Sequence, residues 1–418
     1  MDDSDTSGRT SAGRSLSGGL SRGVSRGVSR GLLRGLSRGV SRGLFGGLFA
    51  AMLASSLLAG CTETPPPATA NGAATATPSA TATATASPTA DSSDPWALRG
   101  VERLVSDSKR LSALVKTGAA KEFLSRASLL PRVEKRTLFF TADKSKYYTE
   151  AQAAALPEDA RAALKQQVVD EEEYYNTHYG SPLSYSRPLD ILFSRGVTLP
   201  AGSKYLDFGY GYIGHLRILA SMGVECTGVD VWALLPVLYS FPGDQGAVTG
   251  PAGEKGSVRL VDGKFPADPA VVKSVGAGYT LITAKNVLKR GYIHPERPVE
   301  HPEKLIKLEV SDEVAIKAFH DALAPGGHFL IYNIAPALTP PDKPFVPWSD
   351  GRSPFTKAQF EAAGFEVLEF DKDDLPAVQA MAKGLGWDQP MDGEPGMDIQ
   401  NDLSALYTLV RKPLAQKK

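Results

Sequence analysis

Apolar runs and helical stretches alternate along residues 204–410 of this 418-residue chain. Each apolar run is short, bounded by turn residues and followed by polar or helical sequence. The runs lie at 204–208, 225–229, 258–262, 279–283, 327–332, 365–370 and 405–410, and the helical stretches at 215–222, 314–322 and 357–363. This alternation predicts an α/β fold, a doubly wound and mostly parallel seven-stranded sheet with helices on both faces. In such a sheet, ligands bind at the carboxyl ends of the strands.

The segment in front of this region, residues 96–182, has a mainly helical pattern. Residues 151–173 are rich in good helix formers, and Pro157 followed by two acidic residues is a typical helix start. Four aromatic or imidazole rings then follow within residues 174–179. They either cover a ligand pocket or form a packed helix end with tyrosine hydroxyls at the surface. We therefore expect an N-terminal helical segment before the sheet.

Residues 1–95 contain few large apolar side chains outside one short stretch. Residues 13–43 repeat a Ser-Arg-Gly unit, residues 44–58 are apolar, and residues 64–95 are almost entirely Pro, Ala, Thr and Ser. A basic region followed by a short apolar run is typical of a secretory signal, whereas the last part suits an extended linker. The apolar run ends in Leu58-Ala59-Gly60-Cys61, which resembles the bacterial lipobox.

The lipobox resemblance implies that Cys61 is lipidated and anchors the chain to a membrane, on the periplasmic or outer-membrane side. Residues 1–61 would then be a disordered signal region, and residues 62–95 a linker to the folded part. Two alternatives stay open. Either the match arises by chance, or the true translation start lies downstream and the protein is cytoplasmic.

Charge and cysteine content narrow the function. Lys+Arg and Asp+Glu both number 46, so the formal net charge is zero and nucleic acid binding is not indicated. The two cysteines, Cys61 and Cys226, give no disulfide framework and no metal-ligand cluster. Cys226 lies among apolar residues of a predicted strand, which favours a core position. No nucleophile-elbow, zinc-protease or P-loop motif occurs, so hydrolase and phosphotransferase functions have no support.

A glycine-rich turn follows the first predicted strand. Glycines 209, 211 and 214 let the backbone turn tightly, approach a ligand closely and open a helix. Asp230 closes the second strand, about 20 residues after Gly209, which is the spacing at which a carboxylate meets ribose hydroxyls. Alone, this pattern is shared by enzymes that bind NAD, FAD or S-adenosylmethionine (SAM).

Further features point to one of these cofactors. Asp207 lies two residues before Gly209, Asp262 ends the third strand, and Pro325-Gly326-Gly327 precedes the fifth. Together these motifs resemble the class I SAM-dependent methyltransferases over roughly residues 183–413, within a domain placed at 183–418. Tyr210 and Tyr212 are bulkier than the family's usual residues, and the insert at 232–257 is long. The resemblance implies that SAM is the cofactor and that it is bound by Asp207, Gly209, Gly211, Gly214, Asp230, Asp262 and Lys285.

Residues after the fourth strand are expected to face the methyl acceptor. The candidates for catalysis are Asn286, Tyr292 and His294, with His294 the proton acceptor because histidine titrates near neutral pH. Equally, His294 is a surface histidine before a proline. Tyr332 and Asn333, after the fifth strand, are a second candidate pair. The basic residues Lys289, Arg290 and Arg297 are expected to form a solvated face rather than an anion site.

Two functions follow from these patterns. The first is a SAM-dependent methyltransferase that acts on a small-molecule acceptor. The second is a membrane-anchored binding module on a methyltransferase fold that has lost catalysis, which would explain a SAM site behind an export signal. No motif for the methylation of nucleic acid bases follows the fourth strand.

Overall fold

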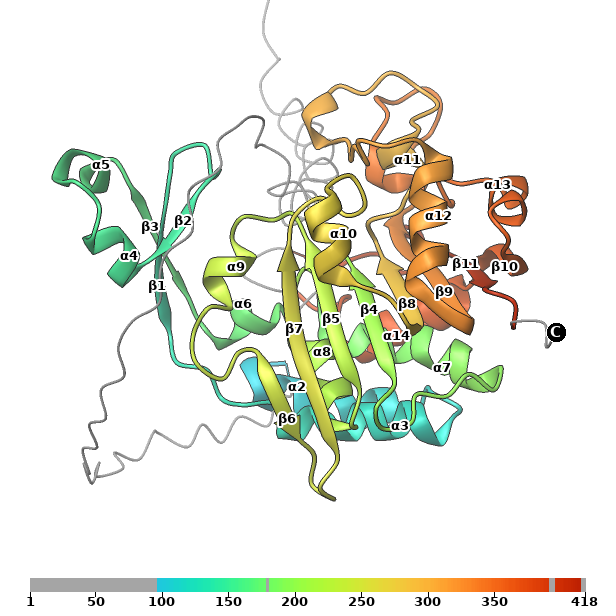
Figure 1. The fold of residues 1–418 in the computed structure, drawn as a ribbon, viewed down its shortest axis with the longest axis horizontal. Helices are drawn as coiled ribbons and strands as arrows, with labels where there is room; N and C mark the ends of the chain where they lie inside the picture. The colour runs from blue at the N-terminus through green and yellow to red at the C-terminus, as the bar shows by residue number, and fades with distance from the viewer. Residues whose placement is uncertain (1–95, 178–179, 391–394, 415–418) are drawn as a thin grey trace, which may run out of the picture. The chain divides into compact units, whose positions relative to one another are not determined.

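The computed structural model describes residues 96–177, 180–390 and 395–414 (Figure 1). The predicted signal region, the linker and Cys61 lie outside these residues. Within them, no helix has the length and apolar character needed to cross a membrane.

The central sheet has eight strands in the order β10-β11-β9-β8-β4-β5-β7-β6 (Figure 1). The four pairings among β9, β8, β4, β5 and β7 are parallel, whereas β6, β10 and β11 join the sheet through antiparallel pairings. The strands are β4 Lys204–Phe208, β5 Glu225–Asp230, β6 Gly246–Thr249, β7 Lys255–Asp262, β8 Tyr279–Lys285, β9 Leu323–Pro336, β10 Glu366–Asp373 and β11 Leu403–Arg411. The predicted fold class is confirmed, with β6 added to the expected strands by a hairpin within the long insert.

Strand order places a switch point between β4 and β8. From β4 the chain builds outward through β5 to β7, and it then returns to place β8 on the other side of β4. Successive connections therefore leave the carboxyl ends of β4 and β8 in opposite directions, which opens a crevice there. The glycine turn that follows β4 lies at this crevice.

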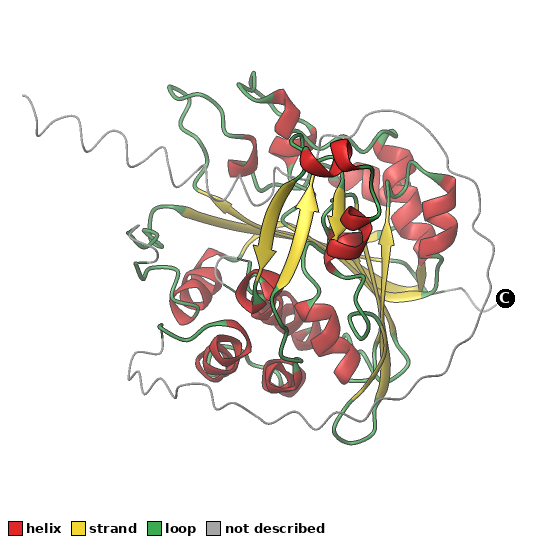
Figure 2. Cartoon of the chain, turned by 90° about the vertical axis from the view of Figure 1, so that its left-hand side faces the viewer, coloured by secondary structure: helices red, strands yellow, loops and turns green. Residues whose placement is uncertain are grey.

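Helices cover both faces of the sheet (Figure 2). On one face, α8 Gly214–Ser221 and α14 Leu375–Gly384 contact the strands, and α2 Gly100–Ser112, α3 Gly118–Ser125 and α7 Ser186–Ser194 pack with them in the same core. The other face packs against α10 Pro269–Val275, α12 Asp312–Ala322 and α13 Lys357–Ala362. Adjacent residues of β8 show the division, because Leu281 belongs to the first core and Ile282 to the second. Burial on both faces explains why these strands read as continuous apolar runs.

The N-terminal segment is only partly helical, which corrects the sequence prediction. It contains a three-stranded antiparallel sheet of β1 Arg136–Phe140, β2 Tyr147–Thr149 and β3 Lys165–Val169, in the order β2-β1-β3. The stretch expected to be helical, residues 151–173, is divided into α4 Glu150–Ala154, α5 Glu158–Ala162, β3 and α6 Glu171–Tyr175. Pairing of β3 with the apolar strand β1 outweighs the helix propensity of the intervening residues.

A buried ion pair joins this small sheet to the insert of the central domain. The Arg136 guanidinium donates to the two carboxylate oxygens of Asp244 at 2.7 and 2.8 Å, and the Tyr174 hydroxyl donates to the same carboxylate at 2.9 Å. The nearby helix α9 Leu235–Leu238 contacts β1 and β2. Tyr175 is also buried and donates to the Pro131 carbonyl. Tyr174 and Tyr175 thus form a packed helix end, with hydroxyls bonded inside the protein, while residues 178–179 are not described.

Candidate cofactor and acceptor site

The glycine turn has two positions where only glycine fits without strain. Gly209 has a φ of +72° and Gly211 a φ of +58°. A Cβ on Gly209 would lie 2.6 Å from Cγ1 of Val287, so the segment after β8 packs directly on the turn. A Cβ on Gly211 would meet no atom within 4 Å. The turn is therefore closed at Gly209 and bordered by open space at Gly211.

Gly214 is closely packed, and its contact with a cofactor stays a prediction. It starts α8, and a Cβ there would lie 2.8 Å from the side chain of Pro182 in the 3-10 helix Pro182–Tyr185. Glycine at this position lets the N-terminal segment pack against the start of α8.

Asp230 fixes the open part of the turn. It ends β5, and its Oδ2 accepts a 3.0 Å hydrogen bond from the backbone N–H of Gly211. Its Oδ1 accepts from the N–H groups of Val231 and Trp232 at 2.7 and 3.0 Å. Burial raises the pKa of Asp230, although these three hydrogen bonds act to lower it. Since a carboxylate offers about four acceptor positions, capacity for one more donor remains.

Asp207 lies beneath the turn with no exposed surface. Its Oδ2 accepts from the Tyr185 hydroxyl at 2.6 Å and contacts Nε2 of His215 at 2.8 Å, while Oδ1 accepts from the Thr283 hydroxyl. The Tyr185 ring stacks on the imidazole of His215 with centroids 3.7 Å apart. Asp207 thus joins β4, β8 and α8 inside the protein, and its direct contact with a cofactor stays a prediction.

The two tyrosines of the turn fill space around it. The Tyr210 ring would lie 2.7 Å from a Cβ on Gly228, so glycine in β5 makes room for it. Tyr212 meets the indole of Trp232 edge to face at 5.9 Å. Asp262, at the end of β7, pairs in register with Asp230. Its side chain is exposed and makes no hydrogen bond with any residue of the described ranges.

The carboxyl end of β8 presents a lysine to the same region. Lys285 is partly buried, and its ammonium lies 5.2 Å from the centroid of the Tyr185 ring. It has no hydrogen bond or ion pair with the described part of the chain. Burial lowers the pKa of Lys285 to about 8, although the Asp207 carboxylate acts to raise it. A cation without a hydrogen-bond or ion-pair partner in the described residues thus lies beside the glycine turn.

Asn286 ends the β8 ladder. It adopts a φ of +67°, its N–H donates to the Tyr332 carbonyl at 3.0 Å, and its Oδ1 accepts from the N–H of Ile334 at 2.8 Å. Asn333 donates through Nδ2 to the carbonyls of Leu288 and Gly351. The Tyr332 hydroxyl donates to Asp374 at 2.7 Å. In this structure Asn286 and Asn333 hold the loops after β8 and β9, whereas the Tyr332 hydroxyl is bonded at the start of α14.

Lys289 is fully buried, which corrects the expectation of a solvated basic face. Its ammonium donates to the carbonyls of Ile334 and Trp348 at 2.8 and 3.3 Å. No carboxylate pairs with it in the described residues. Burial, together with the positive charge of Lys285, lowers the pKa of Lys289 to about 7.

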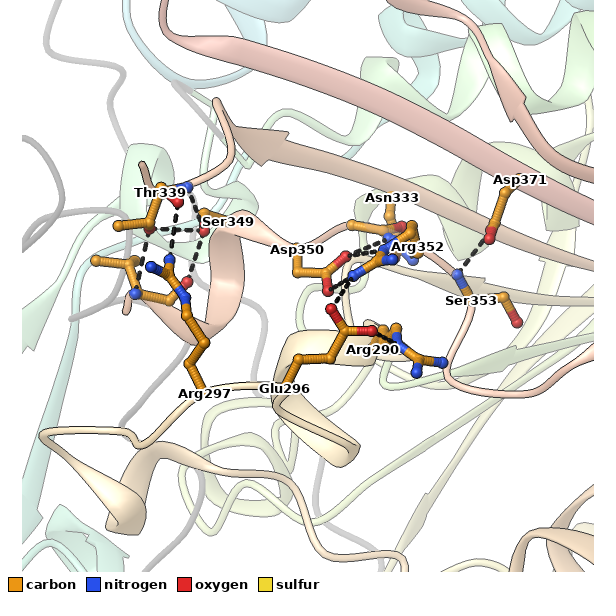
Figure 3. Close-up of polar contacts among 12 residues, drawn as sticks. Arg290, Glu296, Arg297, Asn333, Thr339, Ser349, Asp350, Arg352, Ser353 and Asp371 are labelled. Atoms are coloured by element: carbon orange, nitrogen blue, oxygen red, sulfur yellow. Dashed lines mark hydrogen bonds and ion pairs between the residues drawn. The ribbon is translucent and has the colours of Figure 1, made fainter. Parts of the chain in front are cut away.

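The segments after β8 and β9, residues 287–311 and 337–356, are tied by a row of alternating charges (Figure 3). Glu296 contacts Arg290 and Arg352, each at 3.0 Å, and Arg352 also pairs with Asp350. Arg297 donates to the carbonyls of Thr339 and Pro340. These three arginines are therefore engaged with other groups of the protein. We call these two segments the acceptor cap, because they cover the carboxyl ends of the strands.

The other two predicted catalytic residues differ in exposure. Tyr292 is buried in the acceptor cap against Trp348, and burial raises its pKa. His294 is exposed, and its Nε2 lies 3.0 Å from the carboxylate of Asp312 at the start of α12. The structure thus gives His294 the surface position that the sequence left open.

Two further observations concern metal binding and a cavity away from the glycine turn. The described residues hold no group of His, Cys, Asp and Glu that could bind a metal ion. A polar cavity of about 360 Å³ lies at the opposite edge of the sheet, at the amino ends of β4, β5 and β8. Its lining includes Lys204, Glu225 and Arg259, and none of the glycine-turn residues.

The sequence matches no protein-family model, and no curated protein matches it significantly. Among solved structures it is similar to the (4+2)-cyclase SpnF, with 16% identity, a TM-score of 0.31 and coverage of 56% of this chain and 83% of that chain. It is also similar to a putative sarcosine dimethylglycine methyltransferase from Galdieria sulphuraria, with 14% identity, a TM-score of 0.31 and coverage of 56% and 86%. A third similar structure is the Haemonchus contortus phosphoethanolamine N-methyltransferase 2, with 13% identity, a TM-score of 0.31 and coverage of 60% of this chain and 62% of that chain.

Proposed function

We propose that this chain binds SAM at the carboxyl ends of β4, β5 and β8 and transfers its methyl group to a small-molecule acceptor. One observation carries the proposal. The turn at the switch point borders open space at Gly211, and the Asp230 carboxylate is fixed beside that space. A glycine turn and a strand-end acid in this arrangement suit an adenosyl ligand.

The residues fit the parts of that cofactor. Asp230 retains an acceptor position for a ribose hydroxyl, and Asp262 is exposed at the next strand end, where it is available to an adenine amino group. When bound, SAM supplies a methyl group on a sulfonium, which an acceptor attacks in line. The protein's part is to hold the cofactor and to orient the acceptor beneath the acceptor cap.

Calorimetric titration of the full chain with SAM and with S-adenosylhomocysteine tests the proposal. We expect both to bind, and Asp230→Ala to lower both affinities at least about tenfold, since a hydrogen bond to a charged group is lost. Lys204→Met, at the opposite edge of the sheet, is the matched control. Absence of binding at millimolar cofactor would overturn the proposal.

A second function, a binding module without catalysis, is favoured by one observation. Of the predicted catalytic residues, His294 is held by Asp312 at the surface and Tyr292 is buried. A module of this kind would bind the cofactor or its product but would transfer no methyl group. Incubation with methyl-labelled SAM and the small-molecule fraction of a cell extract separates the two functions. Label in a new product supports the enzyme, and cofactor binding without transfer supports the module.

We further propose that Cys61 carries a lipid that anchors the protein to a membrane. The Leu58-Ala59-Gly60-Cys61 sequence and the Pro- and Ala-rich linker after it support this proposal. Growth with labelled palmitate tests it, with Cys61→Ser as the control. Label on the wild-type protein alone is the expected result, whereas an unlabelled, soluble protein would favour a downstream start and a cytoplasmic location.

A further inference from the structure

The charge available at the end of β8 is positive. The Lys285 ammonium is partly buried and has no hydrogen bond or ion pair with the described residues. Removing an ammonium from water without a partner is costly, so a site that keeps one usually supplies it to a ligand. The Tyr185 ring beneath it offers only a weak cation–π contact at 5.2 Å.

The nearest acid does not neutralise this site by direct contact. The Asp207 carboxylate is held by Tyr185, His215 and Thr283, and it has no exposed surface from which to reach a ligand or an ammonium outside. Lys289, four residues further along the chain, is a second basic group that pairs with no carboxylate of the described residues. An incoming anion therefore meets Lys285 first, and an incoming ammonium meets no free acid here.

The position of Lys285 relative to Asp230 sets the length of the ligand. β5 and β8 flank β4, so their ends are about 10 Å apart, given a strand spacing of about 4.8 Å. The Gly209–Gly214 turn lies between them, and Val287 brings the β8 segment onto it. A ligand with its ribose at Asp230 that passes the turn on its open side, at Gly211, would reach toward Lys285 with the far end of a four-carbon chain. In SAM and S-adenosylhomocysteine, that end carries an amino-acid carboxylate.

We propose that Lys285 binds the amino-acid carboxylate of the cofactor, and that it thereby selects adenosyl ligands that carry this group over those that lack it. The inference rests on the proposed SAM function. A charge-assisted N–H···O bond in a partly buried site is among the stronger hydrogen bonds that a protein makes.

Calorimetry with three ligands tests the assignment: S-adenosylhomocysteine, its decarboxylated analogue and 5′-methylthioadenosine. The full chain is compared with Lys285→Met, Lys285→Arg and the control Lys204→Met. We expect the wild type and the Lys204→Met protein to prefer S-adenosylhomocysteine over the analogue by at least about tenfold. Lys285→Met should abolish this preference without changing the affinity for 5′-methylthioadenosine, and Lys285→Arg should restore part of it.

The outcomes are distinct. If Lys285→Met keeps the full preference, the carboxylate is bound elsewhere and the assignment is wrong, as it would be if Lys285 instead served a carboxylate of the acceptor. If the wild type binds none of the three ligands, the proposed function fails, and this assignment fails with it. Thermal melting checks that Lys285→Met is folded, which we expect because methionine removes an unpaired ammonium from a partly buried site.

Discussion

The ammonium of Lys289 donates to the carbonyl of Ile334 at 2.8 Å, and so replaces the strand partner that β8 no longer provides. The N–H of the same Ile334 is bonded by the side chain of Asn286 at 2.8 Å. Two side chains thus continue the hydrogen bonding of the sheet after its backbone has turned away. This arrangement lets the loop leave β8 toward the acceptor cap without orphaned polar groups on β9.

The burial of Lys289 predicts a pH-dependent stability. Its pKa is about 7 in the folded protein and 10.5 as an ordinary lysine. Between these values the unfolded chain holds a proton that the folded chain has lost, so the free energy of unfolding rises with pH. The contribution is complete above the unfolded pKa and is lost as the pH falls toward 7. Lys289→Met should remove a slope of up to about 1.4 kcal/mol per pH unit.

Denaturant unfolding at pH 7, 8 and 9 measures that slope. Lys317→Met is the matched control, since Lys317 is exposed on α12 and pairs with Asp321. Its pH dependence should follow that of the wild type. Equal slopes for the wild type and Lys289→Met would show that Lys289 is not buried as described.

Two neighbouring glycines should differ in their tolerance of alanine. Gly211→Ala meets no atom and should cost only the left-handed backbone strain, about 1–2 kcal/mol. Gly209→Ala adds a clash with Val287 and should cost about 1–3 kcal/mol more, measured by chemical denaturation. The double variant with Val287→Ala should recover most of that excess. An equal cost for both glycine variants would contradict the close contact between the turn and the β8 segment.

The two strand-end acids, Asp230 and Asp262, should differ in how much they contribute to stability. Asp230→Ala leaves the N–H groups of Gly211, Val231 and Trp232 without an acceptor and should cost about 1–3 kcal/mol. Asp262 has no hydrogen-bond partner in the described ranges, so Asp262→Ala should change stability by less than about 0.5 kcal/mol. Thermal melting with and without S-adenosylhomocysteine measures both effects. A larger loss of stability for Asp262→Ala than for Asp230→Ala would contradict the role of Asp230 in fixing the turn.

The ion pair between Arg136 and Asp244 should matter far more than an exposed one. Arg136→Met leaves a buried carboxylate without its cation and should destabilise the protein by about 3 kcal/mol or more. Arg132, which precedes β1, is itself exposed where it pairs with Glu102 and Glu171, and Arg132→Met should cost less than about 1 kcal/mol. Chemical denaturation of both variants gives the comparison. Similar losses would mean that the N-terminal sheet is not held through Arg136.

The sequence was most informative where one local rule decided the structure. The predicted run 204–208 is β4 itself, and the glycines at 209 and 211 adopt the positive φ values that the turn requires. The run at 225–229 becomes β5, which Asp230 closes as expected. These features depend on near neighbours, so hydrophobic pattern and glycine spacing suffice to predict them.

Features that depend on distant contacts were missed. Strand β3 forms because β1 is available to pair with it, although its own sequence resembles a helix. From the sequence, Lys289 is expected to be a solvated cation, but packing within the acceptor cap buries it. The cluster around Asp207 joins Tyr185, His215 and Thr283 from three elements, and no spacing in the sequence signals it. The sequence showed an acidic residue at position 207, but it did not show which groups contact that carboxylate.

The position of β11 has a consequence for biosynthesis. This strand pairs with β9 on one side and with β10 on the other. Until residues 403–411 leave the ribosome, β9 lacks an outer neighbour and β10 has no place in the sheet. The sheet therefore stays incomplete until β11 has been made, and loss of residues 403–411 would leave the apolar strand β9 without its outer neighbour and exposed to chaperones and proteases.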